Sequence, residues 1–151
     1  GANMELMGVY DKALVEPLAR VLANLGVKKA MVVYGQDGLD EISMSAPTTV
    51  CEVKDGEFLS YVITPEQFGF TRCSKDELIG GSPQDNAQIA LAILKGEKGP
   101  RRDAVVLNSA AAIHIAKGIS IEDAIREAQE VIESGKALAQ LEQFAALTNQ
   151  E

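Results

Sequence analysis

Residues 4–34 read MELMGVYDKALVEPLARVLANLGVKKAMVVY, and their order of apolar and polar positions sets the expected architecture. Both ends, residues 4–10 and 30–34, are short apolar runs typical of strands. Between them, leucine and valine recur every three or four residues, which predicts a helix with one buried face that ends at Gly26. Pro17 removes a backbone donor, so this helix is either kinked there or begins near Glu16. The order strand, helix, strand outlines a βαβ unit.

The middle of the chain predicts antiparallel strands. Residues 48–54 and 57–63 are strand-like and flank Asp55-Gly56, a strong hairpin signal. Further on, Thr64, Ser82 and Ser120 each have the pattern of a helix N-cap. We expect helices at 83–95, 101–116, 121–132 and 136–147. The helix at 101–116 should be buried all round. The last helix should carry an apolar stripe of Leu138, Leu141, Phe144 and Ala145. The sum is an α/β fold, a mixed sheet flanked by helices, in one domain over residues 1–151.

Charge and composition exclude several classes of function. The 151 residues carry 14 Lys and Arg against 22 Asp and Glu, a net charge of −8, which argues against nucleic-acid binding. No apolar run reaches the roughly 18–20 residues that span a bilayer, and no signal-peptide pattern is present, so we expect no membrane contact. Cys51 and Cys73 form neither a disulfide framework nor a metal-binding spacing. We interpret both as reduced thiols in a cytoplasmic protein.

The most informative candidate site follows the second strand, in the sequence YGQDGLDEIS of residues 34–43. Ligand sites of α/β sheets lie at the carboxyl ends of strands, and this loop holds Asp37, Asp40 and Glu41. Mg²⁺ is typically held by one or two carboxylates together with water and phosphate oxygens. Asp40 and Glu41, adjacent in a loop, could both reach one ion. The alternative is a solvated acidic turn.

Three further features have plainer interpretations. The basic residues Lys95, Lys98, Arg101 and Arg102 could receive a phosphate or an acidic partner, although such a run is more often a solvated connection between helices. His114 lies in an apolar helix and is best explained as a structural, hydrogen-bonded residue. Gly80-Gly81 lacks the phosphate-loop pattern and is explained by a tight turn before the Ser82 cap.

Many short blocks of the chain resemble one known family. The blocks are residues 6–11, 14–19, 37–43, Pro47-Thr48, 55–57, 64–69, Gly80-Gly81, Pro83, Asn86, 96–103, Leu107-Asn108 and 134–137. With these blocks in this order, the chain resembles the C-terminal part of anthranilate phosphoribosyltransferase. The resemblance implies part of a phosphoribosyltransferase and nucleoside-phosphorylase-like catalytic domain. It also implies transfer of phosphoribose from phosphoribosyl pyrophosphate to anthranilate, in tryptophan biosynthesis. The family uses Mg²⁺, and its Asp-Glu pair corresponds to Asp40 and Glu41.

Other parts of the family pattern do not occur in these residues. The Gly-Thr-Gly-Gly-Asp loop, the Lys/Asn segment after it, a metal-sharing serine and an arginine for anthranilate belong upstream, and Tyr34 stands where the family usually has histidine. We therefore expect a C-terminal portion of a longer enzyme, inactive alone, whose substrates bind mainly through the N-terminal half. Open sheet edges and uncovered apolar surface predict a homodimer or other self-association. The alternatives are a pyrimidine nucleoside phosphorylase-like enzyme and a non-catalytic scaffold of the same fold.

Overall fold

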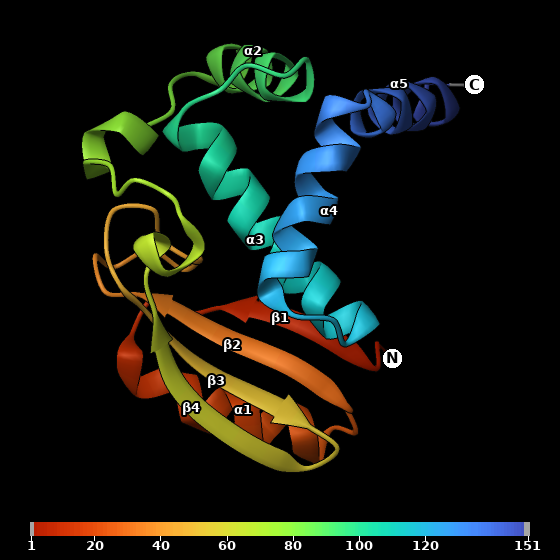
Figure 1. Ribbon diagram of the computed structural model, residues 1–151. Helices are drawn as coiled ribbons and strands as arrows, with labels where there is room; N and C mark the ends of the chain where they lie inside the picture. The colour runs from red at the N-terminus through yellow and green to blue at the C-terminus, as the bar shows by residue number, and fades with distance from the viewer. Residues whose placement is uncertain (1, 150–151) are drawn as a thin grey trace.

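One four-stranded mixed sheet organises the chain (Figure 1). The computed structural model describes residues 2–149. The strands lie in the order β1-β2-β3-β4, with bounds Met4–Gly8, Lys29–Gly35, Thr48–Lys54 and Glu57–Ile63. β1 and β2 are parallel, whereas β2 with β3 and β3 with β4 are antiparallel. The predicted mixed sheet and the Asp55-Gly56 hairpin are confirmed.

The first parallel pair is joined by α1 (Val15–Asn24), as a βαβ unit requires. Pro17 is the third residue of α1, a position whose backbone N–H has no acceptor within the helix, so proline costs no hydrogen bond there. The helix therefore begins close to Glu16. β1 stops at Gly8, two residues before the predicted end. Val9 still donates to the Val33 carbonyl at 2.9 Å, but Asp11 then caps the short 3₁₀ helix η1 (Lys12–Leu14), which turns the chain.

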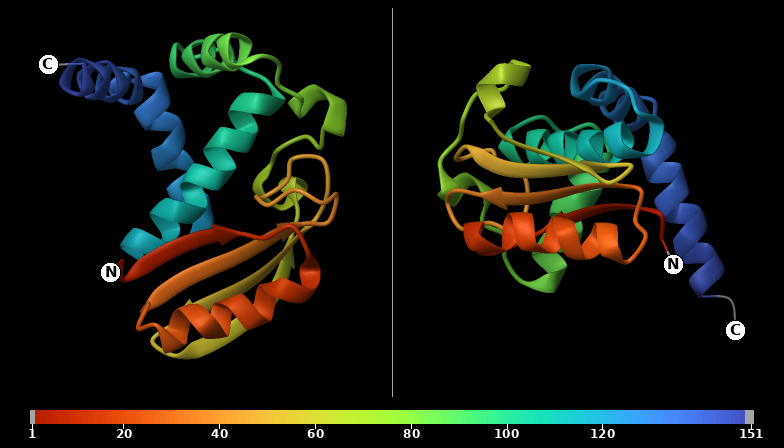
Figure 2. Two further views of the ribbon diagram at one scale, coloured as in Figure 1. Left: turned by 180° about the vertical axis from the view of Figure 1, so that it is seen from behind. Right: turned by 90° about the horizontal axis from the view of Figure 1, so that it is seen from below.

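The sheet separates two apolar clusters. On one face α1 packs on the sheet through Val15, Ala19 and Leu22. On the other face lie α3 (Pro100–Lys117) and α4 (Ile121–Glu133), which contribute most of the larger cluster together with Ile42 and Met44. Figure 2 shows α1 and the α3–α4 pair on opposite sides of the sheet. The parallel edge of the sheet is therefore covered on both faces.

Three expectations for the helices need correction. The Thr64 capping box opens only a short 3₁₀ helix, η2 (Pro65–Phe68), because Gly69 adopts the left-handed conformation and ends it. The helix α3 is buried along one face and exposed along another that carries Val105 and Ser109. The last helix, α5 (Lys136–Thr148), contains no buried residue, so its predicted apolar stripe does not enter the core.

The exposed position of α5 has a visible cause. α5 lies beyond α4 at the end of the molecule far from the sheet (Figure 1), and its large apolar residues Leu141, Phe144 and Leu147 are exposed. Between η2 and α2 (Pro83–Leu94) the chain forms one more 3₁₀ helix, η3 (Lys75–Leu78).

In the described residues no single helix is both long and apolar enough to cross a membrane, and α3 and α4 pass that test only as a pair bent by 117°.

Candidate functional site

The candidate site lies in the β2–β3 loop, residues 36–47, at the carboxyl ends of the two parallel strands. Gly35 ends β2, and its N–H donates to the Leu39 carbonyl at 2.8 Å, which turns the loop back over the strand. Gly8 ends β1 directly beneath Asp40. A Cβ atom on Gly8 would lie 1.5 Å from the Asp40 carbonyl oxygen, so the two backbones touch. The loop therefore places Asp40 and Glu41 where ligands bind in α/β sheets.

Asp37 holds the loop in shape. Its carboxylate accepts hydrogen bonds from the hydroxyl of Ser43 at 2.7 Å and from that of Ser45, and its carbonyl oxygen accepts one from Lys75 Nζ at 2.8 Å. Partial burial acts to raise the pKa of Asp37, but the bonds from Ser45 and Ser43 outweigh it and the pKa is lowered. Asp37 is thus an ionised internal brace, a role that the sequence alone did not assign.

Asn108 braces the other end of the acidic segment. Its Oδ1 accepts from the Ile42 N–H at 2.9 Å, and its Nδ2 donates to the Ile42 carbonyl at 2.9 Å. The Ile42 side chain is only 2% exposed and lies in the larger core cluster. The residue directly after Glu41 is therefore fixed through its side chain and both backbone groups.

Asp40 and Glu41, the acidic pair, remain exposed above these braces. Partial burial, followed by the negative charges of Asp40 and Asp37, raises the pKa of Glu41. A cation beside the pair would relieve this crowding of negative charge. Within residues 2–149, no three Asp, Glu, His or Cys side chains cluster closely enough to hold a metal by themselves. Two carboxylate ligands suit Mg²⁺, which keeps water and phosphate oxygens as its other ligands.

A pocket of about 480 Å³ and another of about 570 Å³ lie between α2 and α3. Glu41 lines the larger one, the Glu41 pocket, whose walls are mostly apolar side chains such as Leu78, Ile89 and Val105. Arg101 and Asn108 of α3 also line it. Through Glu41, the acidic pair thus borders a cavity with mostly apolar walls and Arg101 at its edge.

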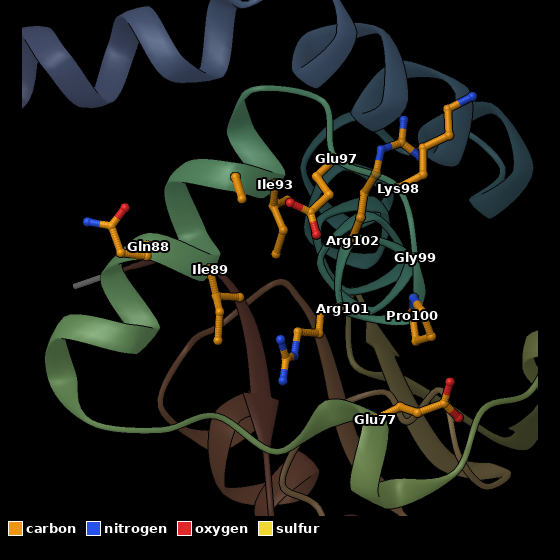
Figure 3. A pocket seen from close by; sticks show the side chains of 11 residues that line it. Glu77, Gln88, Ile89, Ile93, Glu97, Lys98, Gly99, Pro100, Arg101 and Arg102 are labelled. Atoms are coloured by element: carbon orange, nitrogen blue, oxygen red, sulfur yellow. The ribbon is translucent and has the colours of Figure 1, made fainter.

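The basic run does not act as a unit. All three of Lys98, Arg101 and Arg102 line the smaller pocket, but the charged ends of Lys98 and Arg102 point away from that of Arg101 (Figure 3). Arg101 donates to the Ile79 carbonyl at 2.6 Å. Arg102 is 5% exposed and pairs with Glu133 of α4 at 2.7 Å, while its Nε has no hydrogen-bond partner among residues 2–149. The interpretation as a solvated connection is therefore wrong for Arg102, whose aliphatic stem and charge are buried between α3 and α4.

His114 and the glycine pair lie where the plainer interpretations put them. His114 Nδ1 is 2.5 Å from the Ile119 carbonyl oxygen, and Nε2 is 3.4 Å from Glu52 Oε1, so the ring joins the end of α3 to β3. The Gly81 N–H donates to Asn86 Oδ1 at 2.9 Å, which folds the glycine turn onto the first turn of α2. Tyr34 is half-buried and packs on the α1 cluster.

Residues 1–138 match the model of the glycosyl transferase family, a/b domain. The chain belongs to this family. Its sequence is 59% identical over 150 residues to the anthranilate phosphoribosyltransferase of Methanobrevibacter smithii, covering 99% of this chain and 45% of that protein. The corresponding enzyme of Lachnoclostridium phytofermentans is 55% identical, with the same coverage. The chain thus spans about 45% of the length of these curated relatives.

Solved structures agree with the family assignment. The anthranilate phosphoribosyltransferase of Thermus thermophilus superposes with a TM-score of 0.84 at 38% identity, over 92% of this chain and 41% of that one. The Saccharomyces cerevisiae enzyme in complex with PRPP and Mg gives a TM-score of 0.85 at 29% identity, over 94% and 42%. The α/β fold expected from the resemblance, and the resemblance itself, are confirmed.

Proposed function

We propose that the chain forms the metal-binding part of an anthranilate phosphoribosyltransferase. The observation that carries this proposal is the position of the acidic pair. Asp40 and Glu41 lie exposed at the carboxyl ends of β1 and β2, beside a pocket of about 570 Å³, in a chain 59% identical to such an enzyme. The reaction would transfer phosphoribose from phosphoribosyl pyrophosphate to the amine of anthranilate and release pyrophosphate, a step of tryptophan biosynthesis.

Mg²⁺ is the ion that this site suits, and the carboxylates of Asp40 and Glu41 would hold it. When bound, Mg²⁺ supplies positive charge that stabilises the departing pyrophosphate. The chain's own residues would shape the site: Asp37 and Asn108 keep the loop in place, and Glu41 borders a pocket whose walls are mostly apolar. A solved yeast relative holds PRPP together with Mg, which supports this choice of ion.

The remaining chemistry would belong to residues outside this chain. Phosphoribosyl pyrophosphate and anthranilate would be bound mainly by the upstream part of the longer enzyme, so the chain alone should be inactive. We also propose a cytoplasmic enzyme that forms a homodimer or self-associates. The net charge of −8 supports the absence of a nucleic-acid partner.

The test follows the loss of anthranilate fluorescence in the presence of phosphoribosyl pyrophosphate and Mg²⁺. Two proteins are compared: the chain alone, and the chain joined behind the upstream part of the M. smithii relative. We expect consumption of anthranilate only by the joined protein. Turnover by the chain alone would show that the division of the active site is wrong.

The same two proteins also separate the proposal from its alternatives. A joined protein that folds but leaves anthranilate untouched would contradict the proposed function. If it instead cleaved uridine with phosphate, the pyrimidine nucleoside phosphorylase-like alternative would replace it. Inactivity toward both substrates would favour the scaffold alternative.

A further inference from the structure

We propose that Asn108 is a positioning residue for the acidic pair, so that a side chain of α3 sets where Glu41 presents its carboxylate. The inference rests on the proposed function, because it concerns a metal site at Asp40 and Glu41. It adds a residue that would act through the backbone of Ile42 rather than as a ligand of the metal. Asn108 is 66 positions from its partner Ile42 in sequence, so only the folded chain brings them together.

The hydrogen bonds of Asn108 determine its orientation completely. Oδ1 accepts from the Ile42 N–H at 2.9 Å, while Nδ2 donates to the carbonyls of Ile42 at 2.9 Å and Ala104 at 3.0 Å. A reversed amide would place its NH₂ against an N–H and its oxygen against two carbonyls. Aspartate has no donor for those carbonyls, and leucine has neither donor nor acceptor. The bond to Ala104, one turn back in α3, ties the amide to its own helix.

The same bonds replace those that a strand would give Ile42. Ile42 is buried and lies outside the strands, and a buried backbone N–H or C=O without a partner is strongly destabilising. Asn108 satisfies both groups. Its three contacts therefore hold the backbone directly after Glu41 in one place.

The opposite side of Glu41 is held just as closely. The Asp40 carbonyl rests against Gly8 at the end of β1, where even a Cβ atom finds no room. Glu41 thus sits between a contact with β1 and a contact with α3. Because Asn108 and Arg101 of α3 both line the Glu41 pocket, the helix that forms this wall of the pocket also fixes the backbone next to Glu41 at its edge.

The experiment measures Mn²⁺ binding to the 151-residue chain by the loss of the free Mn²⁺ signal in electron paramagnetic resonance. Asn108→Ala removes the amide, and Asn108→Leu replaces its oxygen and nitrogen with methyl groups on the same branched frame. Leu22→Ala is the control, because Leu22 is a buried residue of the other apolar cluster, under α1. Hydrogen exchange of the Ile42 amide is recorded on the same samples.

We expect both Asn108 variants to bind Mn²⁺ about tenfold more weakly, as is typical when a residue that orients a ligand is lost. Exchange of the Ile42 amide should accelerate by about tenfold in both, whereas Leu22→Ala should keep the wild-type Mn²⁺ affinity even though it lowers stability. Unchanged affinity in folded Asn108 variants would overturn the positioning role and leave the metal site intact. Unfolding of both variants would reduce Asn108 to a purely structural residue. A wild-type chain that binds no Mn²⁺ would overturn this inference alone, because anthranilate consumption by the joined protein tests the proposed function separately.

Discussion

Gly8 lies under the Asp40 carbonyl, and Asn108 lies beside Ile42, so the position of the acidic pair depends on two residues that carry no charge. Neither contact can be inferred from the sequence, because each joins segments far apart in the chain. What the sequence did contain was the acidic pair itself, directly after a buried strand. Charged side chains indicate a site, whereas the residues that hold it in place are found only by folding the chain.

Gly8→Ala should displace the acidic pair. Its Cβ would lie 1.5 Å from the Asp40 carbonyl oxygen and 2.4 Å from the carbonyl carbon, so the loop must move. We expect a loss of about 1–3 kcal/mol in the free energy of unfolding, measured with urea, and at least about tenfold weaker Mn²⁺ binding. The control is Gly135→Ala, at a left-handed position with open space around it, which should lose about 1–2 kcal/mol with no change in Mn²⁺ affinity. Equal Mn²⁺ binding by the two variants would argue against the close contact.

Asp37 should make the stability of the loop depend on pH. Its pKa is lower in the folded chain than its ordinary value of 3.8, so its ionised form stabilises the fold above that value. This stabilisation is lost as the pH falls through the folded-state pKa. Ser45→Ala removes one donor to the carboxylate, and should lower the free energy of unfolding by about 1 kcal/mol at about pH 7 but by less at a pH below the folded-state pKa of Asp37.

Ser134→Ala is the matched control for that titration. The Ser134 hydroxyl donates to the Val131 carbonyl, which does not titrate, so its effect should be the same at both pH values. A Ser45→Ala effect that is equally constant would contradict the ionised brace.

At the scale of elements, local signals predicted most of the secondary structure. Asp55-Gly56 placed the hairpin correctly because a turn of this kind is determined by its own two residues. Ser82 and Ser120 placed the starts of α2 and α4 for the same reason. Thr64 has an equally good cap, but the sequence pattern did not weigh Gly69, which stops the helix after one turn.

Packing between elements was harder to predict than the elements. The pattern of α3 indicated burial all round, although only one face reaches the sheet and α4. Arg102 was grouped with exposed cations, yet it is buried at the start of α3 and pairs with Glu133 at the end of α4, a contact that only the fold brings about. Periodicity shows that a face is apolar, but does not show what covers it.

Glu133→Ala tests the α3–α4 contact. It removes the ion-pair partner of the buried Arg102 guanidinium, so we expect a loss of about 1–3 kcal/mol in the free energy of unfolding. Glu130→Ala, an exposed glutamate on the same helix, should change it by less than about 0.5 kcal/mol. Urea denaturation measures both, and similar values for the two variants would show that the Arg102 pair contributes little.

At the scale of the whole molecule, the described residues leave apolar surface uncovered. Phe144 and Leu147 of α5 are 60% and 61% exposed, and β1 forms an edge of the sheet. Exposed apolar patches and free strand edges favour association. The larger size of the relatives agrees with the expectation that further chain covers this surface in the complete enzyme.

The isolated chain should therefore self-associate as its concentration rises, which light scattering measures as an increase in mass. The double substitution Phe144→Ser with Leu147→Ser should weaken the association, whereas Gln140→Ser on the same helix should not. A wild-type chain that stays monomeric at high concentration would contradict this prediction.

Binding of the metal for phosphoribosyl transfer is the role proposed for Asp40 and Glu41. The most direct test is the Mg²⁺-dependent rate of anthranilate consumption by the joined protein, with and without the substitutions Asp40→Asn and Glu41→Gln. These amides keep the shape of the acids but remove their charge, so we expect the rate to fall by more than about 100-fold. The control is Asp76→Asn on η3, an exposed acidic residue whose substitution should leave the rate unchanged. Equal rates for the double variant and the wild type would contradict the proposed role.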